Sequence, residues 1–188
     1  MAMCFPTFGT KAETLDRLCK KLQNAKIEKL FYFTVGEWKQ DHSSLLNQTS
    51  KQLGSGPYIV RSSCNQEDTA TGSKAGAFKS ILNVKKVGLN AAINEVIESY
   101  GNKRDLDQVL IQPMLQNVCR SGVAFTHDPN SCAPYRLINW SEGEETSDIT
   151  SGHNGFLWQQ AALSSSEPPI EIEPVLKLLD ELLALYQN

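Results

Sequence analysis

Apolar residues recur along this chain at two different spacings, and each spacing predicts a different kind of element. Helical spacing predicts four helices: from about Thr10 to near Asn24, a weaker one over Asp41–Leu53, one from Leu89 to Tyr100, and a long one from Ile172 to Tyr186. Short apolar runs rich in aromatic and β-branched residues predict strands over 29–35, 58–62, 109–111, 122–125 and 135–140. A further short helix is expected through Phe156, Leu157 and Trp158.

The residues at the ends of these segments support the helices. Thr10-Lys11-Ala12-Glu13 has the form of a capping box, in which the threonine and glutamate side chains satisfy backbone N–H groups at a helix start. Gly54 and Gly101 follow the second and third helical patterns, where glycine commonly ends a helix. Residues 54–57 read as a turn.

The order of these elements predicts an α+β fold. We expect an N-terminal lobe over residues 1–104 and a mostly antiparallel C-terminal lobe over residues 105–188 that ends in a helix. The polar, glycine-containing stretch Ser63–Gly76 follows a buried strand and is too long for a tight turn, so it is a candidate functional loop.

Composition excludes several classes of function. With 40% hydrophobic and 21% charged residues the chain is typical of globular proteins, and a net charge of −3 without a dense Lys/Arg run argues against nucleic acid and anionic membranes as partners. No apolar run approaches the length of a membrane span, and the N-terminus lacks the pattern of a secretion signal. We therefore expect a cytoplasmic protein.

Cysteine and histidine give no metal or disulfide pattern. The five cysteines are scattered and odd in number, and the three histidines lack H-x-x-x-H spacing. Any bound metal ion is therefore expected to have oxygen ligands.

Neither G-x-x-x-x-G-K-[ST] nor G-x-G-x-x-G occurs, but three other stretches resemble one nucleotide-binding family. They are Gly9-Thr10-Lys11-Ala12 with Leu15, then Tyr58–Asp68 with Ala75-Gly76 and Leu82-Asn83-Val84, and then Ile111–Leu115 with Ser121–Pro129. In this order they resemble the ATP-binding domain of phosphoenolpyruvate synthase and pyruvate phosphate dikinase. The G-T-K-A-E-T-L opening and the I-N…T-S-G stretch at 138–152 look closest to the bacterial capsule branch that resembles glutamine kinase.

The resemblance implies a two-lobed ATP-grasp fold and assigns phosphate binding to two cations. Lys11 would hold the nucleotide phosphates from a helix start, and Arg61 would do so from the end of a buried strand. Each has an ordinary alternative: a solvated surface lysine for Lys11, and an ion pair with Glu67 or Asp68 for Arg61.

Further contacts follow from the same resemblance. Gly72 and Gly76 would let the backbone N–H groups of a loop close over the phosphates; the alternative is an ordinary flexible loop. Gln112 and Met114 would face the adenine, although core packing explains Met114 nearly as well. For Mg²⁺ the best candidate ligand is Glu142, with Glu144 or a merely solvated acidic loop as alternatives.

The chain departs from the family at three points. His127 stands where many relatives have arginine, Ser151-Gly152-His153 is only a faint echo of the phosphorylated histidine motif, and the chain stops where the family continues into a D-I-E-x-A strand. We therefore expect an ATP-grasp domain that is truncated at its C-terminus and inactive alone.

The implied activity is that of an AMP-forming kinase. ATP and Mg²⁺ would phosphorylate a histidine on a separate domain of the full-length enzyme, which then passes the group to a small acceptor such as glutamine. The alternative is a non-catalytic nucleotide-sensing or scaffold module.

Overall fold

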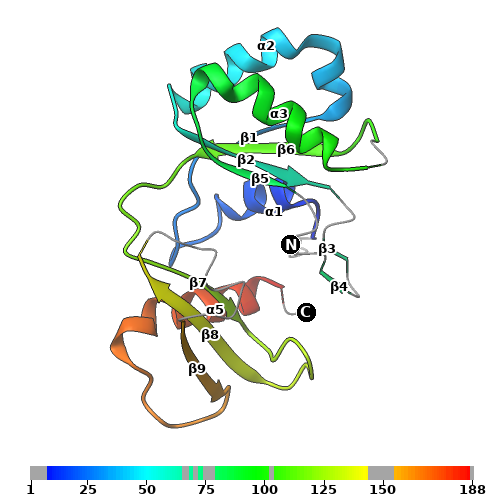
Figure 1. Ribbon diagram of the computed structural model, residues 1–188. Helices are drawn as coiled ribbons and strands as arrows, with labels where there is room; N and C mark the ends of the chain where they lie inside the picture. The colour runs from blue at the N-terminus through cyan, green and yellow to red at the C-terminus, as the bar shows by residue number, and fades with distance from the viewer. Residues whose placement is uncertain are drawn as a thin grey trace. The chain divides into compact units, whose positions relative to one another are not determined.

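The computed structural model describes residues 8–64, 68–69, 72–73, 79–101, 104–143 and 155–186. It has mixed helices and antiparallel sheets, which confirms the α+β class (Figure 1). The contacts divide the chain into two compact units. The first contains Thr7–Lys21 and Lys26–Met114, and the second contains Leu22–Ala25 together with the part of the chain after Met114.

The first unit is organised around a four-stranded antiparallel sheet with the strand order β1-β6-β2-β5. Its strands are β1 (Phe31–Thr34), β2 (Tyr58–Ser63), β5 (Ser80–Val84) and β6 (Gln108–Pro113). Because β6 pairs with both β1 and β2, the predicted strand 109–111 belongs to this sheet, so the two units divide after Met114 rather than near residue 104.

Two helices cover one face of this sheet and a third covers the other (Figure 1). The helices α2 (Val35–Leu53) and α3 (Leu89–Glu98) pack on the face formed by Phe33, Val60, Val109 and Ile111, and the short η1 (Lys86–Gly88) leads into α3. The predicted stripe of α3 is confirmed, because Leu89, Ala92, Ile93, Val96 and Ile97 are all buried. Gly101 follows with a φ of 66°, as expected for a helix stop.

Helix α2 begins earlier than the sequence predicted. Thr34 and Glu37 form a second capping box, in which the Glu37 N–H donates to Thr34 Oγ1 at 3.1 Å and the Thr34 N–H donates to Glu37 Oε2 at 2.7 Å. The predicted start, Asp41, lies at a kink with φ −152° and ψ 74°, where its carboxylate accepts a hydrogen bond from the Ser44 N–H. The prediction therefore found the second half of a kinked helix.

Helix α1 (Lys11–Leu18) begins as predicted, with Thr10 and Glu13 forming the complete capping box, but it ends well before Asn24. Residues 22–25 belong to the second unit, where the Glu181 carboxylate accepts hydrogen bonds from the N–H groups of Gln23 at 2.6 Å and Asn24 at 2.9 Å. These bonds replace the ones that a continued helix would have made.

The second unit is a three-stranded antiparallel sheet packed against a helix. Its strands are β7 (Arg120–Phe125), β8 (Tyr135–Glu142) and β9 (Phe156–Ala161), in that order, followed by η2 (Ile170–Ile172) and α5 (Glu173–Tyr186). Ile138 on β8 packs with Ile172, Leu176 and Leu179 to form the core. The antiparallel pattern and the final helix are confirmed.

The helix predicted through Phe156, Leu157 and Trp158 is wrong, because these residues form β9. Its six residues pair with β8 without interruption, from Phe156 opposite Trp140 to Ala161 opposite Tyr135. An apolar run this short carries no helical period, and its aromatic residues favour a strand.

Candidate functional site

The start of α1 lies on the end of β2 and is held there by buried polar side chains. Ala12 and Ser63 are both fully buried, and the Ala12 N–H donates to Ser63 Oγ at 2.9 Å. Thr10 Oγ1 donates to Gln108 Oε1 at 2.6 Å, while Gln108 Nε2 donates to Glu13 Oε1 at 2.9 Å. Helix start and strand ends therefore form one hydrogen-bonded cluster, which we call the α1 anchor (Thr10, Ala12, Glu13, Ser63 and Gln108).

The α1 anchor brings Lys11 and Arg61 to the same region of the first unit. Lys11 is the first residue of α1 and is half-buried, next to the Ala12 that Ser63 anchors. Arg61 is also half-buried and precedes Ser63 by two residues on β2. The side chains of Arg61 and Ser63 therefore lie on the same face of the sheet, the face that carries α1. Helix α1 therefore begins beside the strand that carries Arg61, and joint contact of Lys11 and Arg61 with phosphate stays a prediction.

The backbone at the start of α1 is already occupied by protein groups. The Ala12 N–H donates to Ser63 Oγ and the Glu13 N–H donates to Thr10 Oγ1 at 3.2 Å. An anion placed here would therefore gain little from these two donors. The Lys11 side chain is the cation at this helix start.

Arg61 has a polar atom without an acceptor. Its Nε is withdrawn from solvent and has no hydrogen-bond partner in the described part of the chain. Buried nitrogen donors are nearly always paired in folded proteins, by protein atoms, water or an ion. Of the alternative partners named from the sequence, Glu67 lies outside the described residues, and of Asp68 only the backbone, in β3, is described.

Gln112 and Met114 lie at the other end of β6 from Gln108. Gln112 is half-buried, and its side-chain nitrogen donates to the Glu28 carbonyl at 3.4 Å. Four residues separate it from Gln108 on the same side of the strand, a distance of about 13 Å. The Met114 N–H donates to the Pro57 carbonyl at 2.9 Å, just after β6 ends.

The predicted phosphate loop is described only in part. Gly72 begins β4 (Gly72–Ser73), which pairs with β3 (Asp68–Thr69) to form a small hairpin. Gly76 lies outside the described residues. The contact of either glycine with phosphate stays a prediction.

Glu142 ends β8 in the second unit, and its side chain is 65% exposed. It forms an ion pair with Arg120 across the β7–β8 ladder at 3.7 Å, which is longer than a hydrogen bond. The alternative ligand Glu144 and the faint motif at His153 lie outside the described residues. His127 is exposed after β7, with its Nδ1 3.2 Å from Thr126 Oγ1.

Within the described residues, no three Asp, Glu, His or Cys side chains gather as a metal site would require. Of the cysteines among them, Cys19, Cys119 and Cys132 are exposed free thiols. In the same part of the chain, no helix combines the length and apolar character needed to span a bilayer.

Sequence reasoning missed the roles of Ser63 and Gln108. Ser63 belongs to the Arg61-Ser62-Ser63 run of the second motif. Its position two residues after Arg61 could have indicated that the two side chains share one face of the strand. Nothing local to Gln108 indicated that its amide would meet Thr10, since 98 residues separate the two.

Comparisons with known proteins agree with this description. The crystal structure of PH1788 from Pyrococcus horikoshii Ot3 is similar in fold, with a TM-score of 0.50, 16% sequence identity, and coverage of 93% of this chain and 74% of that one. No curated protein matches the chain in sequence.

The chain also matches a protein family. The profile described as "Pyruvate phosphate dikinase, AMP/ATP-binding domain" matches residues 11–107, which is more than half of the chain. The match begins at Lys11 and spans β2 and Arg61. It supports nucleotide binding and a family of the kinase type, and the chain therefore belongs to the pyruvate phosphate dikinase AMP/ATP-binding domain family.

Proposed function

We propose that the chain is the ATP-binding portion of an AMP-forming phosphotransferase, and that the phosphates of ATP bind at the α1 anchor between Lys11 and Arg61. The phosphoryl group would pass to a histidine on a separate domain and from there to a small acceptor, for which glutamine is the specific candidate. The family supports the nucleotide-binding part of this proposal.

The observation that carries the proposal is the unsatisfied Nε of Arg61. A guanidinium presents its donors in a planar fork that matches phosphate oxygens, and an acceptor from outside the chain would remove the cost of the unpaired nitrogen. A triphosphate is such an acceptor.

The α1 anchor supports the position of the second cation. Because Ser63 fixes Ala12 and Gln108 fixes both Thr10 and Glu13, the backbone next to Lys11 is held on the same sheet as Arg61. Such preorganisation lowers the entropic cost of binding a flexible, charged ligand. We assign Lys11 and Arg61 to positioning the phosphates and neutralising their charge.

The remaining proposed contacts concern the loop and the base. Gly72 and Gly76 would contribute backbone N–H groups to the phosphates, and Gln112 and Met114 would contact the adenine. The half-buried state of Gln112 and Met114 supports this role, since both remain within reach of a ligand.

Mg²⁺ is the metal ion that nucleotide phosphates commonly carry, and it takes one or two carboxylates in addition to phosphate oxygens. Glu142 fits this chemistry, because its carboxylate is exposed and its ion pair is long. When bound, the ion would neutralise developing negative charge on the phosphates. Glu142 remains the proposed ligand.

Isothermal titration calorimetry with MgATP tests the proposal. The unmodified chain should bind MgATP, and R61Q or K11M should weaken binding at least about tenfold, the loss expected for one charged hydrogen bond. Charge-matched controls are R104Q and K20M, which change exposed residues of the same unit and should leave binding unchanged.

A second set of variants separates phosphate binding from an internal ion pair. If Arg61 only pairs with Glu67 or Asp68, then E67Q with D68N should lower stability as much as R61Q does, and MgATP affinity should not change in R61Q. That result, or no binding of MgATP by the unmodified chain, contradicts the proposal. MgATP binding without phosphate transfer, in a protein that carries the histidine domain, would instead indicate the nucleotide-sensing module.

A further inference from the structure

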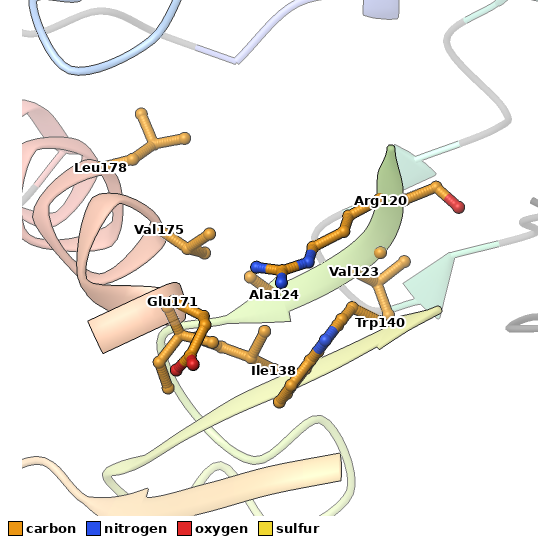
Figure 2. A pocket seen from close by; sticks show the side chains of 11 residues that line it. Arg120, Val123, Ala124, Ile138, Trp140, Glu171, Val175 and Leu178 are labelled. Carbon is orange, nitrogen blue, oxygen red and sulfur yellow. The ribbon is translucent and has the colours of Figure 1, made fainter. Parts of the chain in front are cut away.

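The second unit contains a pocket that the proposed function does not use. It has a volume of about 290 Å³ and lies between β7 and β8 on one side and η2 and α5 on the other (Figure 2). Its apolar walls come from both sides: Ala124, Ile138, Trp140, Ile172, Val175 and Leu178.

The pocket exists because the residues of β7 that face α5 are small. Gly122 and Ala124 lie opposite Trp140 and Ile138 of β8, on the same face of the sheet as the buried Ile138. Gly122 cannot be larger, since an added Cβ would lie 2.5 Å from the Asn139 carbonyl oxygen. The strand pairing itself therefore keeps this part of the pocket open.

Two opposite charges lie on opposite walls of the pocket. Figure 2 shows the Arg120 guanidinium extending from β7 toward η2 and α5, and Glu171 of η2 lines the opposite side of the pocket. Arg120 has only the 3.7 Å pair with Glu142, in which both side chains are largely exposed, and Glu171 has no hydrogen bond or ion pair within the described residues. Both charges therefore remain available to a ligand that carries the opposite charges.

The backbone of β7 adds hydrogen-bonding groups beside these charges. Among the described strands β7 lies at one edge of its sheet, and the Gly143 N–H donates to the Cys119 carbonyl at 2.8 Å, which continues the β7–β8 ladder. Hydrogen-bonded and non-hydrogen-bonded pairs alternate along an antiparallel ladder, so the N–H and C=O of Gly122 point away from β8, toward the open edge. They can pair with a ligand in the way that a neighbouring strand would.

We propose that this pocket binds a free α-amino acid with a large apolar side chain, of the size of leucine or phenylalanine. The carboxylate would pair with Arg120 and accept from the Gly122 N–H, and the ammonium group would pair with Glu171 and donate to the Gly122 C=O. The side chain would fill the apolar cavity, whose volume exceeds the roughly 150 Å³ that suffices to hold a benzene molecule. All of these residues belong to the second unit, and the inference does not require nucleotide to bind, although Arg120 also pairs with Glu142, the proposed Mg²⁺ ligand.

Calorimetric titration with L-phenylalanine and L-leucine tests this inference. Both should bind, and three analogues of phenylalanine should bind at least about tenfold more weakly, because each lacks a charge that the pocket recognises. They are phenethylamine, without the carboxylate; 3-phenylpropionate, without the ammonium group; and N-acetylphenylalanine amide, without either charge.

Variants of the pocket complete the test. E171Q and R120Q should each weaken phenylalanine binding at least tenfold, and A124L should abolish it by filling the cavity. E173Q removes an exposed charge from the first turn of α5, outside the pocket lining, and should bind as the unmodified chain does. Circular dichroism and thermal unfolding establish whether each variant is folded. If R120Q is unstable, phenylalanine binding by E171Q and A124L still tests the inference.

Three outcomes overturn the inference. The first is that neither amino acid binds at millimolar concentration. The second is that the acetylated amide binds as well as phenylalanine, which would mean that the pocket holds a segment of polypeptide. The third is that binding persists in folded A124L, which would place the amino acid elsewhere.

Discussion

Replacement of Ser63 by alanine isolates the contribution of the α1 anchor. The hydroxyl of Ser63 accepts the Ala12 N–H at 2.9 Å, and both residues are 0% exposed. Water cannot replace the lost acceptor without opening the packing, so S63A leaves a buried N–H unpaired at a cost of about 1–3 kcal/mol. The backbone N–H of Ser63, which donates to the Tyr100 hydroxyl, is unaffected.

Two measurements detect this loss. Urea denaturation followed by circular dichroism gives the free energy of unfolding, and for a unit on the order of 100 residues each kcal/mol lowers Tm by roughly 4–8 °C. Native-state hydrogen exchange then shows where the structure opens: amides in Lys11–Leu18 should lose protection, while those of α3 should change less.

S80A is the matched control, because Ser80 lies on β5 of the same sheet with an exposed side chain. It should change the free energy of unfolding by less than about 0.5 kcal/mol. The reasoning is refuted if S63A is as mild as S80A, or if exchange in α1 is unaltered.

Three further predictions follow from packing and charge. I93A removes a fully buried core side chain and should lower the free energy of unfolding by about 2–5 kcal/mol in urea denaturation, whereas V87A, at a residue that is 95% exposed, should have little effect. G122A places a Cβ 2.5 Å from the Asn139 carbonyl oxygen and should destabilise the second unit by about 1–3 kcal/mol, while G88A, which meets no atom within 4 Å, should not lower stability; equal effects in the two thermal unfolding curves would contradict this. The N–H groups of Asn24 and Gln23 lower the pKa of Glu181, so its contribution to stability is present above the unfolded pKa and lost as pH falls through the folded value. An NMR titration should give Glu181 a pKa below that of an ordinary glutamate, and E181Q should remove this part of the acid dependence of stability.

Local signals in the sequence predicted the parts of the fold that depend on local interactions. The capping box at Thr10, the stripe from Leu89 to Ile97 and the glycine stop at Gly101 all involve residues within a few positions of one another, and all are confirmed. The capping box at Thr34 is an equally local signal, but the helix was predicted to begin only at Asp41.

Features set by distant contacts were not predictable in the same way. Helix α1 does not continue through Gln23 and Asn24, whose N–H groups donate to Glu181, and the strand 109–111 joins the first sheet because it pairs with Phe31–Thr34. The candidate site shows the same division. The motif around Arg61 was enough to name it as a candidate phosphate ligand. The contacts of Ser63 and Gln108 that hold the start of α1 were not predictable in this way, because they span 51 and 98 residues.

The hydrogen bonds between Glu181 and residues 23 and 24 also set an order of events during synthesis. They join positions 157 and 158 residues apart, so the segment that follows α1 leaves the ribosome long before its acceptor exists. The first unit can begin folding on the nascent chain, but the link after α1 must wait until α5 has been translated. Translation that stops before Glu181 would therefore leave Leu22–Ala25 without its final structure, as a target for proteases and chaperones.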